Sequence, residues 1–268
     1  MSKAVSTWSL HRTLGSYFAD DPAPGTPSFA PSPPGAGLAL LELPTELRHH
    51  GYDTVQICHF HFPSRDPGYL SELRSALRDA EIELDAVLID DGDLTHPNEA
   101  DDHEAWISGW LDDAVTLGAR RARVVAGKSA PTPERLAESA RRLGRLAASH
   151  ADVRVVTENW MDLLPTAAEV HAVLQPNDGA VGLLIDLGNW TGPSKYDELA
   201  AVAALAETCH AKCRFDSAGP DTADFRQSLQ VLRTAGYGGP PALIYDGPDD
   251  DEWAALDQED AVVRGVFT

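Results

Sequence analysis

Short apolar runs alternate with amphipathic helical patterns along nearly the whole chain, and this alternation restricts the fold more than any other feature. Apolar runs bounded by turn residues are typical of strands buried in a parallel sheet. Eight such strands, each followed by a helix, match a (β/α)8 barrel, and 268 residues suit that length. The first and seventh strands are weak by composition and are assigned from their place in the series. The expected strands are AVSTWSL (4–10), TVQICHF (54–60), ELDAVLI (83–89), ARVVAG (122–127), VRVVTEN (153–159), VGLLIDL (181–187), TCHAKC (208–213) and PALIYD (241–246).

Helix start signals lie between the strands. Asp66–Pro67 is expected to start a helix over 66–80, and Thr132–Pro133 is expected to start one over 132–150. The alternative fold is an open doubly wound sheet, but no glycine-rich phosphate-binding motif follows any strand. Further helices are expected near 41–50, 99–117, 163–174, 196–206, 222–235 and 252–264.

One proline-rich segment interrupts the series, at residues 19–37 between the first strand and the first helix. Its six prolines exclude a helix. Loops that follow the strands of a barrel lie on the catalytic face, so the segment is either a surface loop or a lid over the pocket. The rest of residues 1–268 is expected to form a single barrel domain.

The charge of the chain restricts its partners. A formal charge of −21 opposes binding to nucleic acid and favours small neutral or cationic partners. The three cysteines form no CxxC pair, which indicates reduced thiols. No signal peptide or long apolar span is present, so we expect a soluble cytoplasmic protein that does not bind membranes. The sequence leaves the oligomeric state open.

The last four strands each carry an oxygen or nitrogen ligand near the carboxyl end. These residues are Glu158, Asp186, His210 and Asp246. In a barrel these ends converge on one mouth, where three carboxylates without a cation would repel one another. One divalent metal would resolve that repulsion. Three oxygens and an imidazole suit Mn²⁺ first, with Mg²⁺, Co²⁺ and Zn²⁺ as alternatives.

The motifs ENW, DLGNW and CHAKC, followed by the acid of the eighth strand, resemble the sugar phosphate isomerase/epimerase superfamily of xylose isomerase-like TIM barrels. That group includes ketose 3-epimerases, hydroxypyruvate isomerase and inosose dehydratase. The resemblance implies one divalent metal held by Glu158, Asp186, His210 and Asp246, with Glu158 and Asp246 as the acid/base pair. Two positions depart from the pattern: Asp246 replaces the usual Glu, and Asn189 replaces a frequent second His.

Side chains around these ligands are candidates for substrate binding. Lys212 and Arg214 share the strand parity of His210, so they should point into the pocket. Cys209 and Cys213 have the opposite parity and should face the helices. Asn189 keeps a hydrogen-bonding amide near the ligands, and other polar or aromatic residues lie near strand ends. The remaining expected contacts are His11, His59, His61 and Trp160.

The expected activity is a metal-dependent isomerisation or epimerisation of a small sugar-like carbonyl compound, through proton abstraction beside the carbonyl. Since Asp246 is shorter than Glu, a lyase that eliminates water is the nearest alternative. A second alternative is a sugar-binding barrel without catalysis. An endonuclease IV-like nuclease is a third class, which the net charge and Asn189 oppose.

Overall fold

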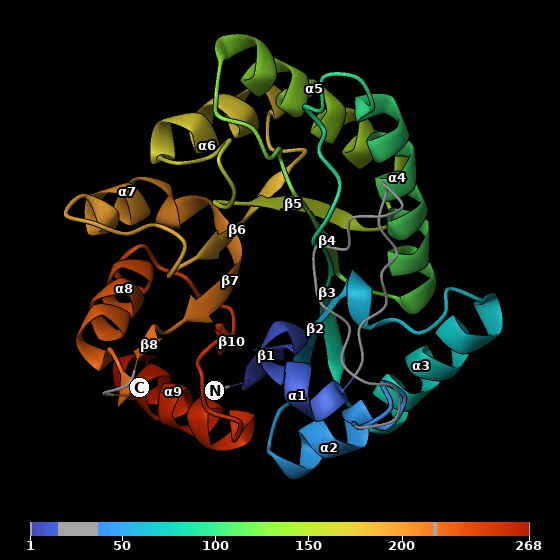
Figure 1. Ribbon diagram of the computed structural model, residues 1–268, viewed down its shortest axis with the longest axis vertical. Helices are drawn as coiled ribbons and strands as arrows, with labels where there is room; N and C mark the ends of the chain where they lie inside the picture. Colours follow the sequence, from blue (N-terminus) through green and yellow to red (C-terminus); the bar gives the residue numbers. More distant parts are fainter. Residues whose placement is uncertain (1, 16–36, 217–218, 268) are drawn as a thin grey trace.

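The computed structural model describes residues 2–15, 37–216 and 219–267. Its eight parallel strands form a closed barrel, in which β10 pairs with β1 (Figure 1). This closure confirms the (β/α)8 barrel and excludes the open doubly wound sheet. The barrel strands are β1 (Ala4–Ser6), β2 (Thr54–Cys58), β3 (Glu83–Ile89), β4 (Arg121–Val124), β5 (Arg154–Glu158), β6 (Gly182–Asp186), β7 (Ala206–Lys212) and β10 (Ala242–Ile244).

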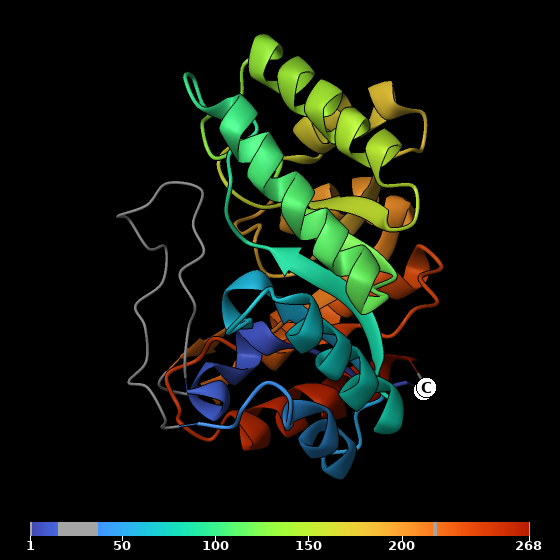
Figure 2. The same cartoon turned by 90° about the vertical axis from the view of Figure 1, so that its right-hand side faces the viewer.

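Helices in the connections form a ring outside the strands (Figures 1 and 2). The expected start signals are present, since Pro67 and Pro133 open α3 and α5, and the Thr132 hydroxyl accepts a hydrogen bond from the Arg135 amide at 3.2 Å. The helices are α1 (His11–Leu14), α2 (Leu43–His49), α3 (Pro67–Asp79), α4 (Ala100–Leu117), α5 (Pro133–Ser149), α6 (Ala167–Leu174), α7 (Lys195–Val202), α8 (Thr222–Thr234) and α9 (Glu252–Phe267).

Strand alternation separates the barrel interior from the layer between strands and helices. Leu184 belongs to the small cluster inside the barrel, whereas Cys209 and Cys213 belong to the large cluster under the helices. The parity read from the sequence is therefore confirmed at these positions. The buried residues of the interior cluster are Cys58, Phe60, Ala86, Leu88, Val156 and Leu184.

Several strands end earlier than the apolar runs suggest, and two of them, β1 and β2, matter for the site. β1 stops at Ser6 and β2 at Cys58, and each continues into a 3₁₀ turn, over Thr7–Leu10 and His59–His61. Side chains in a 3₁₀ turn advance by about 120° and no longer alternate. Strand parity therefore does not extend to these residues.

One further departure concerns a connection. A two-stranded antiparallel sheet, β8 (Phe215–Asp216) with β9 (Gly219–Pro220), lies between β7 and α8, where no strand was expected. The proline-rich segment, apart from Gly37, lies outside the described residues. Among the helices of the described ranges, none has the length and apolar character needed to cross a membrane.

A polar network fills the amino-terminal end of the barrel interior, and we call it the base network. Asp85 of β3 accepts hydrogen bonds from Gln56 at 2.9 Å and Thr208 at 2.7 Å, and it pairs with Arg121. Beside it, Glu207 pairs with Arg154 at 2.5 Å. Each carboxylate of the base network thus meets a guanidinium: Asp85 pairs with the neighbouring β4, and Glu207 reaches across β6 to β5.

Candidate metal centre at the carboxyl end of the barrel

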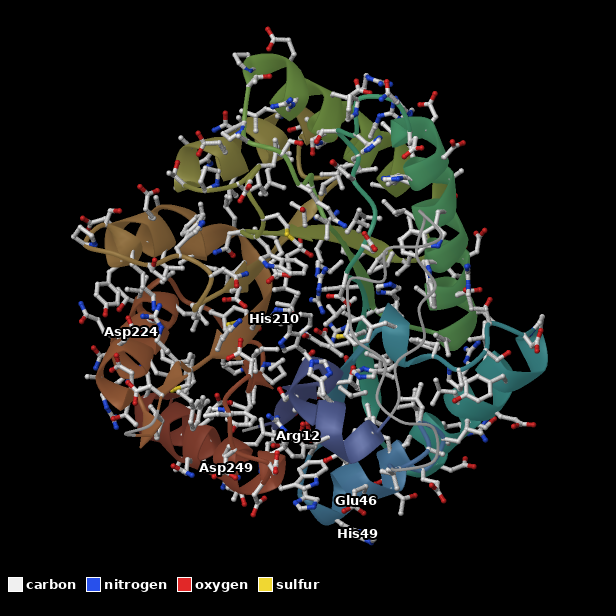
Figure 3. The ribbon with its side chains drawn as sticks, viewed as in Figure 1. Arg12, Glu46, His49, His210, Asp224 and Asp249 are labelled. Carbon is white, nitrogen blue, oxygen red and sulfur yellow. The ribbon has the colours of Figure 1, made fainter. Side chains whose placement is uncertain are left out.

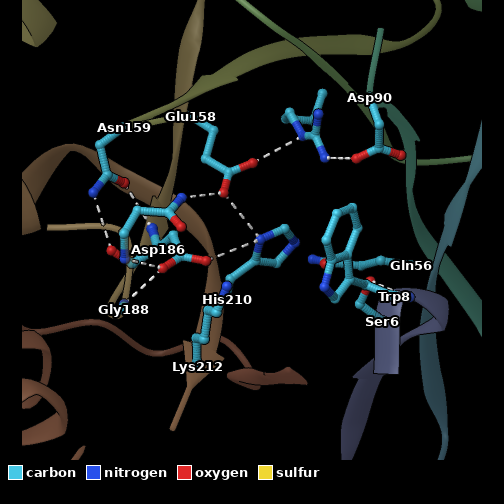
Figure 4. A network of polar contacts seen from close by, with 12 residues as sticks. Ser6, Trp8, Gln56, Asp90, Glu158, Asn159, Asp186, Gly188, His210 and Lys212 are labelled. Atoms are coloured by element: carbon cyan, nitrogen blue, oxygen red, sulfur yellow. Dashed lines mark hydrogen bonds and ion pairs between the residues drawn. The ribbon is translucent and has the colours of Figure 1, made fainter. Parts of the chain in front are cut away.

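Three buried side chains meet at the opposite end of the interior. Glu158, Asp186 and His210 come from β5, β6 and β7, and one ligand atom of each lies within 4.8 Å of the others. Nδ1 of His210 lies 3.3 Å from Oε1 of Glu158 and 3.6 Å from Oδ2 of Asp186. Figure 3 shows His210 inside the ring of strands, and Figure 4 shows the three side chains facing one another. We call them the ligand triad.

The Asp186 carboxylate is held by the main chain just after β6. Its Oδ1 accepts hydrogen bonds from the amides of Gly188 at 2.6 Å and Asn189 at 2.7 Å. The Asn159 amide supports the backbone of the same residue: it accepts from the Asp186 N–H at 2.7 Å and donates to the Asp186 carbonyl at 3.0 Å. Oδ2 is left to face His210.

The Glu158 carboxylate is held by neighbours on both sides. Its Oε1 accepts a hydrogen bond from the Asn189 side chain at 3.0 Å and faces His210. Its Oε2 forms an ion pair with Nε of Arg123 at 3.0 Å. The two oxygens therefore have different partners, one in the ligand triad and one on β4.

The two acids determine the protonation of the imidazole. Burial alone would lower the pKa of His210, but Glu158 and Asp186 outweigh burial and raise this pKa to about 9. Burial would raise the pKa of Asp186, yet the hydrogen bond from His210 and the charge of Lys212 hold it below its ordinary value. In the metal-free protein a positive charge on the imidazole offsets the two carboxylates.

The donor set fits a divalent cation. Ligands about 2.0–2.3 Å from one metal lie about 3–4 Å from each other, which is the spacing within the ligand triad. Nε2 of His210 is buried and has no hydrogen-bond partner among the described residues. Two carboxylates and one imidazole suit Mn²⁺, Mg²⁺, Co²⁺ or Zn²⁺. The same site that a protonated imidazole neutralises can therefore bind a metal.

Asp246 is not part of the group within 4.8 Å. It lies just beyond β10, its side chain is 39% exposed, and its carboxylate pairs with the Lys212 ammonium at 2.6 Å. Burial lowers the pKa of Lys212, but Asp186 and Asp246 outweigh burial and raise it. The assignment of Asp246 as fourth ligand stays a prediction. For Asp246 to bind the metal, its ion pair with Lys212 would have to separate.

The ligand triad opens into a cavity with about 330 Å³ of empty space. Three of the expected substrate contacts line it: Trp160, Asn189 and Lys212. Arg214 is exposed and lies outside this lining.

The three expected histidines lie outside this lining as well. His11 contacts His61, with 3.4 Å between Nδ1 and Nε2, and burial lowers the pKa of His11 to about 4. The side chain of His59 is buried behind Asp90, whose amide donates to its Nδ1 at 3.1 Å. The 3₁₀ turns after β1 and β2 account for these positions, and contacts of these histidines with a substrate stay predictions.

Sequence reasoning missed three polar or aromatic residues that line the cavity: Trp8, Asp90 and Arg123. Asp90 ends the run VLID just as Asp186 ends LLID, so the rule that singled out Asp186 would also have found Asp90. Arg123 is a charged residue at an inward position of a short apolar strand, which is a second usable signal. Trp8 lies in a 3₁₀ turn and left no comparable pattern.

Comparison with known proteins agrees with this geometry. A xylose isomerase-like TIM barrel protein from Mycobacterium smegmatis, solved in complex with magnesium, has 16% identity and a TM-score of 0.71, covering 100% of this chain and 98% of that chain. A D-allulose 3-epimerase from Methylomonas sp. has 14% identity and a TM-score of 0.71 over 100% and 98% of the two chains. A probable 3-DHS dehydratase from Bacillus anthracis has 12% identity and a TM-score of 0.69 over 96% and 98%.

At these identities the likenesses show the fold alone. No curated protein has a sequence that matches the chain. The family described as xylose isomerase-like TIM barrel matches residues 44–264, a range that contains the whole ligand triad. The chain belongs to the xylose isomerase-like TIM barrel family.

Proposed function

We propose that this protein is a divalent-metal-dependent isomerase or epimerase of a small sugar-like compound that carries a carbonyl group. The observation that carries the proposal is the ligand triad, which is buried at the mouth of the barrel and borders a cavity. The family and the solved sugar epimerases with the same fold support this choice of chemistry. Mn²⁺ or Mg²⁺ is the proposed metal.

Each side chain has a distinct task in this proposal. When bound, the metal would polarise the carbonyl of the substrate and acidify the neighbouring carbon. Glu158 accepts the proton, and Asp246 serves as the second acid/base group and as a fourth ligand. Lys212 holds an oxyanion, carboxylate or phosphate of the substrate. Trp160 and Asn189, which line the cavity, contact the sugar.

A lyase that eliminates water is the second candidate, and one observation favours it. Lys212 forms an ion pair with Asp246 at the edge of the cavity, so its ammonium is placed to protonate a leaving hydroxyl. The solved structures with this fold include a probable 3-DHS dehydratase. Elimination and isomerisation share the first step, which is proton abstraction beside a carbonyl.

The test combines metal analysis with proton exchange. Wild-type protein loaded with Mn²⁺ should retain one metal per chain and catalyse exchange of a carbon-bound proton of one member of a ketose panel in D₂O. Asp186→Ala should lose both properties. Asp101→Ala is the matched control, because this side chain is 92% exposed, and it should retain both.

Two results would contradict the proposal. One is a wild-type protein that binds no divalent metal at a defined stoichiometry. The other is an Asp186→Ala variant with the metal content of the wild type. Release of water from the exchanging substrate would assign the lyase, and a rearranged sugar would assign the isomerase or epimerase.

A further inference from the structure

Arg123 is a buried guanidinium with three partners: two accept hydrogen bonds from its Nη atoms, and Nε meets the third in an ion pair that lacks hydrogen-bond geometry. Nη1 donates to the Ile89 carbonyl at 3.0 Å, Nη2 donates to Oδ1 of Asp90, and Nε pairs with Oε2 of Glu158 at 3.0 Å. Its Cζ atom lies 5.0 Å from the centre of the Trp160 ring. With a residue exposure of 2%, the group is fixed on all sides by β3, β5 and the residues that follow them.

The far partner of Arg123 is itself fixed. Burial would raise the pKa of Asp90, but the charge of Arg123 and the neighbouring His59 lower it to about 2, so the carboxylate stays ionised. The His59 ring packs edge-on against Trp106 and Trp110, with centroids 5.4 and 5.5 Å away. His59 just after β2, Asp90 just after β3 and Arg123 on β4 thus form a buried support, which we call the buttress.

The ion pair between Nε of Arg123 and Oε2 of Glu158 connects the buttress to the ligand triad; it is one of the dashed lines that leave Glu158 in Figure 4. The other oxygen of that carboxylate, Oε1, faces His210 and lies on the side of Asp186. A free carboxylate can bind a metal through one oxygen or through both. Because Oε2 faces the guanidinium in an ion pair, Oε1 is the oxygen that faces the centre of the ligand triad.

We propose that Arg123 is a positioning residue that restricts Glu158 to a single metal-binding oxygen, and so keeps a coordination position open for the substrate. This inference rests on the metal centre of the proposed function. Arginine suits the task because its planar fork can hold the Ile89 carbonyl, Asp90 and Glu158 at once, which the single ammonium of lysine cannot do.

The test uses Co²⁺, whose visible absorption weakens as its coordination number rises. In Arg123→Met the long side chain remains beside Trp160, but Oε2 is released and can become an additional ligand. We expect the absorption intensity of the Co²⁺-loaded variant to fall about twofold or more against wild type, since geometry at such sites is diagnostic. A purely structural role of Arg123 would leave this spectrum unchanged in folded protein.

The matched control is Arg121→Met. Arg121 lies on the same strand and also points inward, but it pairs with Asp85 in the base network. Its Co²⁺ spectrum should equal that of wild type. If Arg123→Met does not fold, Arg123→Lys provides the same test, because it keeps the charge and loses the fork. An intermediate fall in intensity is then expected.

A folded Arg123→Met or Arg123→Lys protein with the wild-type Co²⁺ spectrum would overturn the inference. An equal fall in Arg121→Met would also overturn it, because the effect would then follow from any lost interior charge. Failure of the wild-type protein to bind Co²⁺ or Mn²⁺ would instead overturn the metal centre itself, and this outcome is distinct from the others.

Discussion

The two ends of the barrel interior hold acidic side chains in opposite situations. In the base network, Asp85 and Glu207 are matched by Arg121 and Arg154. At the mouth, four carboxylates gather around two permanent cations, Arg123 and Lys212. The remaining two negative charges share one imidazole, His210. The four carboxylates are Asp90, Glu158, Asp186 and Asp246.

This difference separates a structural network from a functional site. Charges that already have a partner of opposite sign need no ligand, and removing one partner destabilises the fold. Unmatched buried charges cost stability unless a proton or a cation is bound. The surplus of acids at the mouth therefore marks the end of the barrel where a cation belongs, and the following experiments test this distinction.

The largest effect is expected for Glu158→Gln. Glutamine keeps the shape and one ligand oxygen but cannot accept a proton, so turnover of an identified substrate should fall about 100- to 10,000-fold. The measurement is steady-state kinetics with circular dichroism as a check of folding. The matched variant in the base network, Glu207→Gln, should keep its turnover. Near-normal activity of Glu158→Gln would remove the distinction between the two ends.

The second effect is on stability. Asp85→Ala leaves Arg121 without its buried partner, and the free energy of unfolding should decrease by about 3 kcal/mol. Denaturant unfolding of the metal-free protein measures this change. Asp186→Ala should decrease it much less, since that substitution relieves repulsion between acids at the mouth. Equal losses in the two variants would show that the mouth is as structural as the base.

A smaller effect is expected for Asp246→Glu. The added methylene extends the carboxylate by about 1–1.5 Å, past Lys212 and toward the ligand triad. Mn²⁺ should bind about tenfold more tightly, which corresponds to about 1.4 kcal/mol, and solvent deuterium should enter the product from both faces. Titration calorimetry and NMR measure the two effects. Asp249→Glu, on the neighbouring loop, is the control, and unchanged binding in Asp246→Glu would argue against a ligand at this position.

The smallest effect concerns a buried acid away from both ends, Glu259 of α9, whose carboxylate has no side-chain hydrogen-bond partner in the described ranges. Burial raises its pKa well above the ordinary 4.5, and the main-chain N–H of Cys213 offsets this only in part. Above pH 4.5 the folded state then binds more protons than the unfolded chain, so stability falls as the pH rises.

Glu259→Gln should remove this pH dependence and raise the free energy of unfolding at neutral pH by about 1 kcal/mol. Thermal unfolding between pH 4 and 8 measures the effect, with Asp257→Asn, whose side chain is 67% exposed, as the control. A stability difference between Glu259→Gln and wild type that does not grow as the pH rises would contradict the assignment. A single buried acid that only lowers stability would also show that burial of one carboxylate does not by itself indicate a functional site.

The sequence predicts the barrel well because its main signals are local. Apolar runs give six of the eight barrel strands, the first and seventh follow from their place in the series, and proline with Thr or Asp marks the starts of α3 and α5. Glu158, Asp186 and His210 were found because strand ends of a barrel converge by topology. The pairing of Arg123 with Glu158, and of Lys212 with Asp246, depends on the reach of long side chains across neighbouring strands. No pattern within a single strand contains that information.

Asn159 has a consequence for redesign of this site. Its side-chain amide forms hydrogen bonds with the main-chain N–H and carbonyl of Asp186. These two bonds link β5 to β6 where a further pair of main-chain hydrogen bonds would otherwise stand. Asn159 touches the main chain at position 186, and so it supports that position whatever side chain stands there. The backbone that supports the metal centre is therefore independent of the ligand side chain at position 186. An engineer could replace that side chain to suit another metal while Asn159 still links β5 to β6.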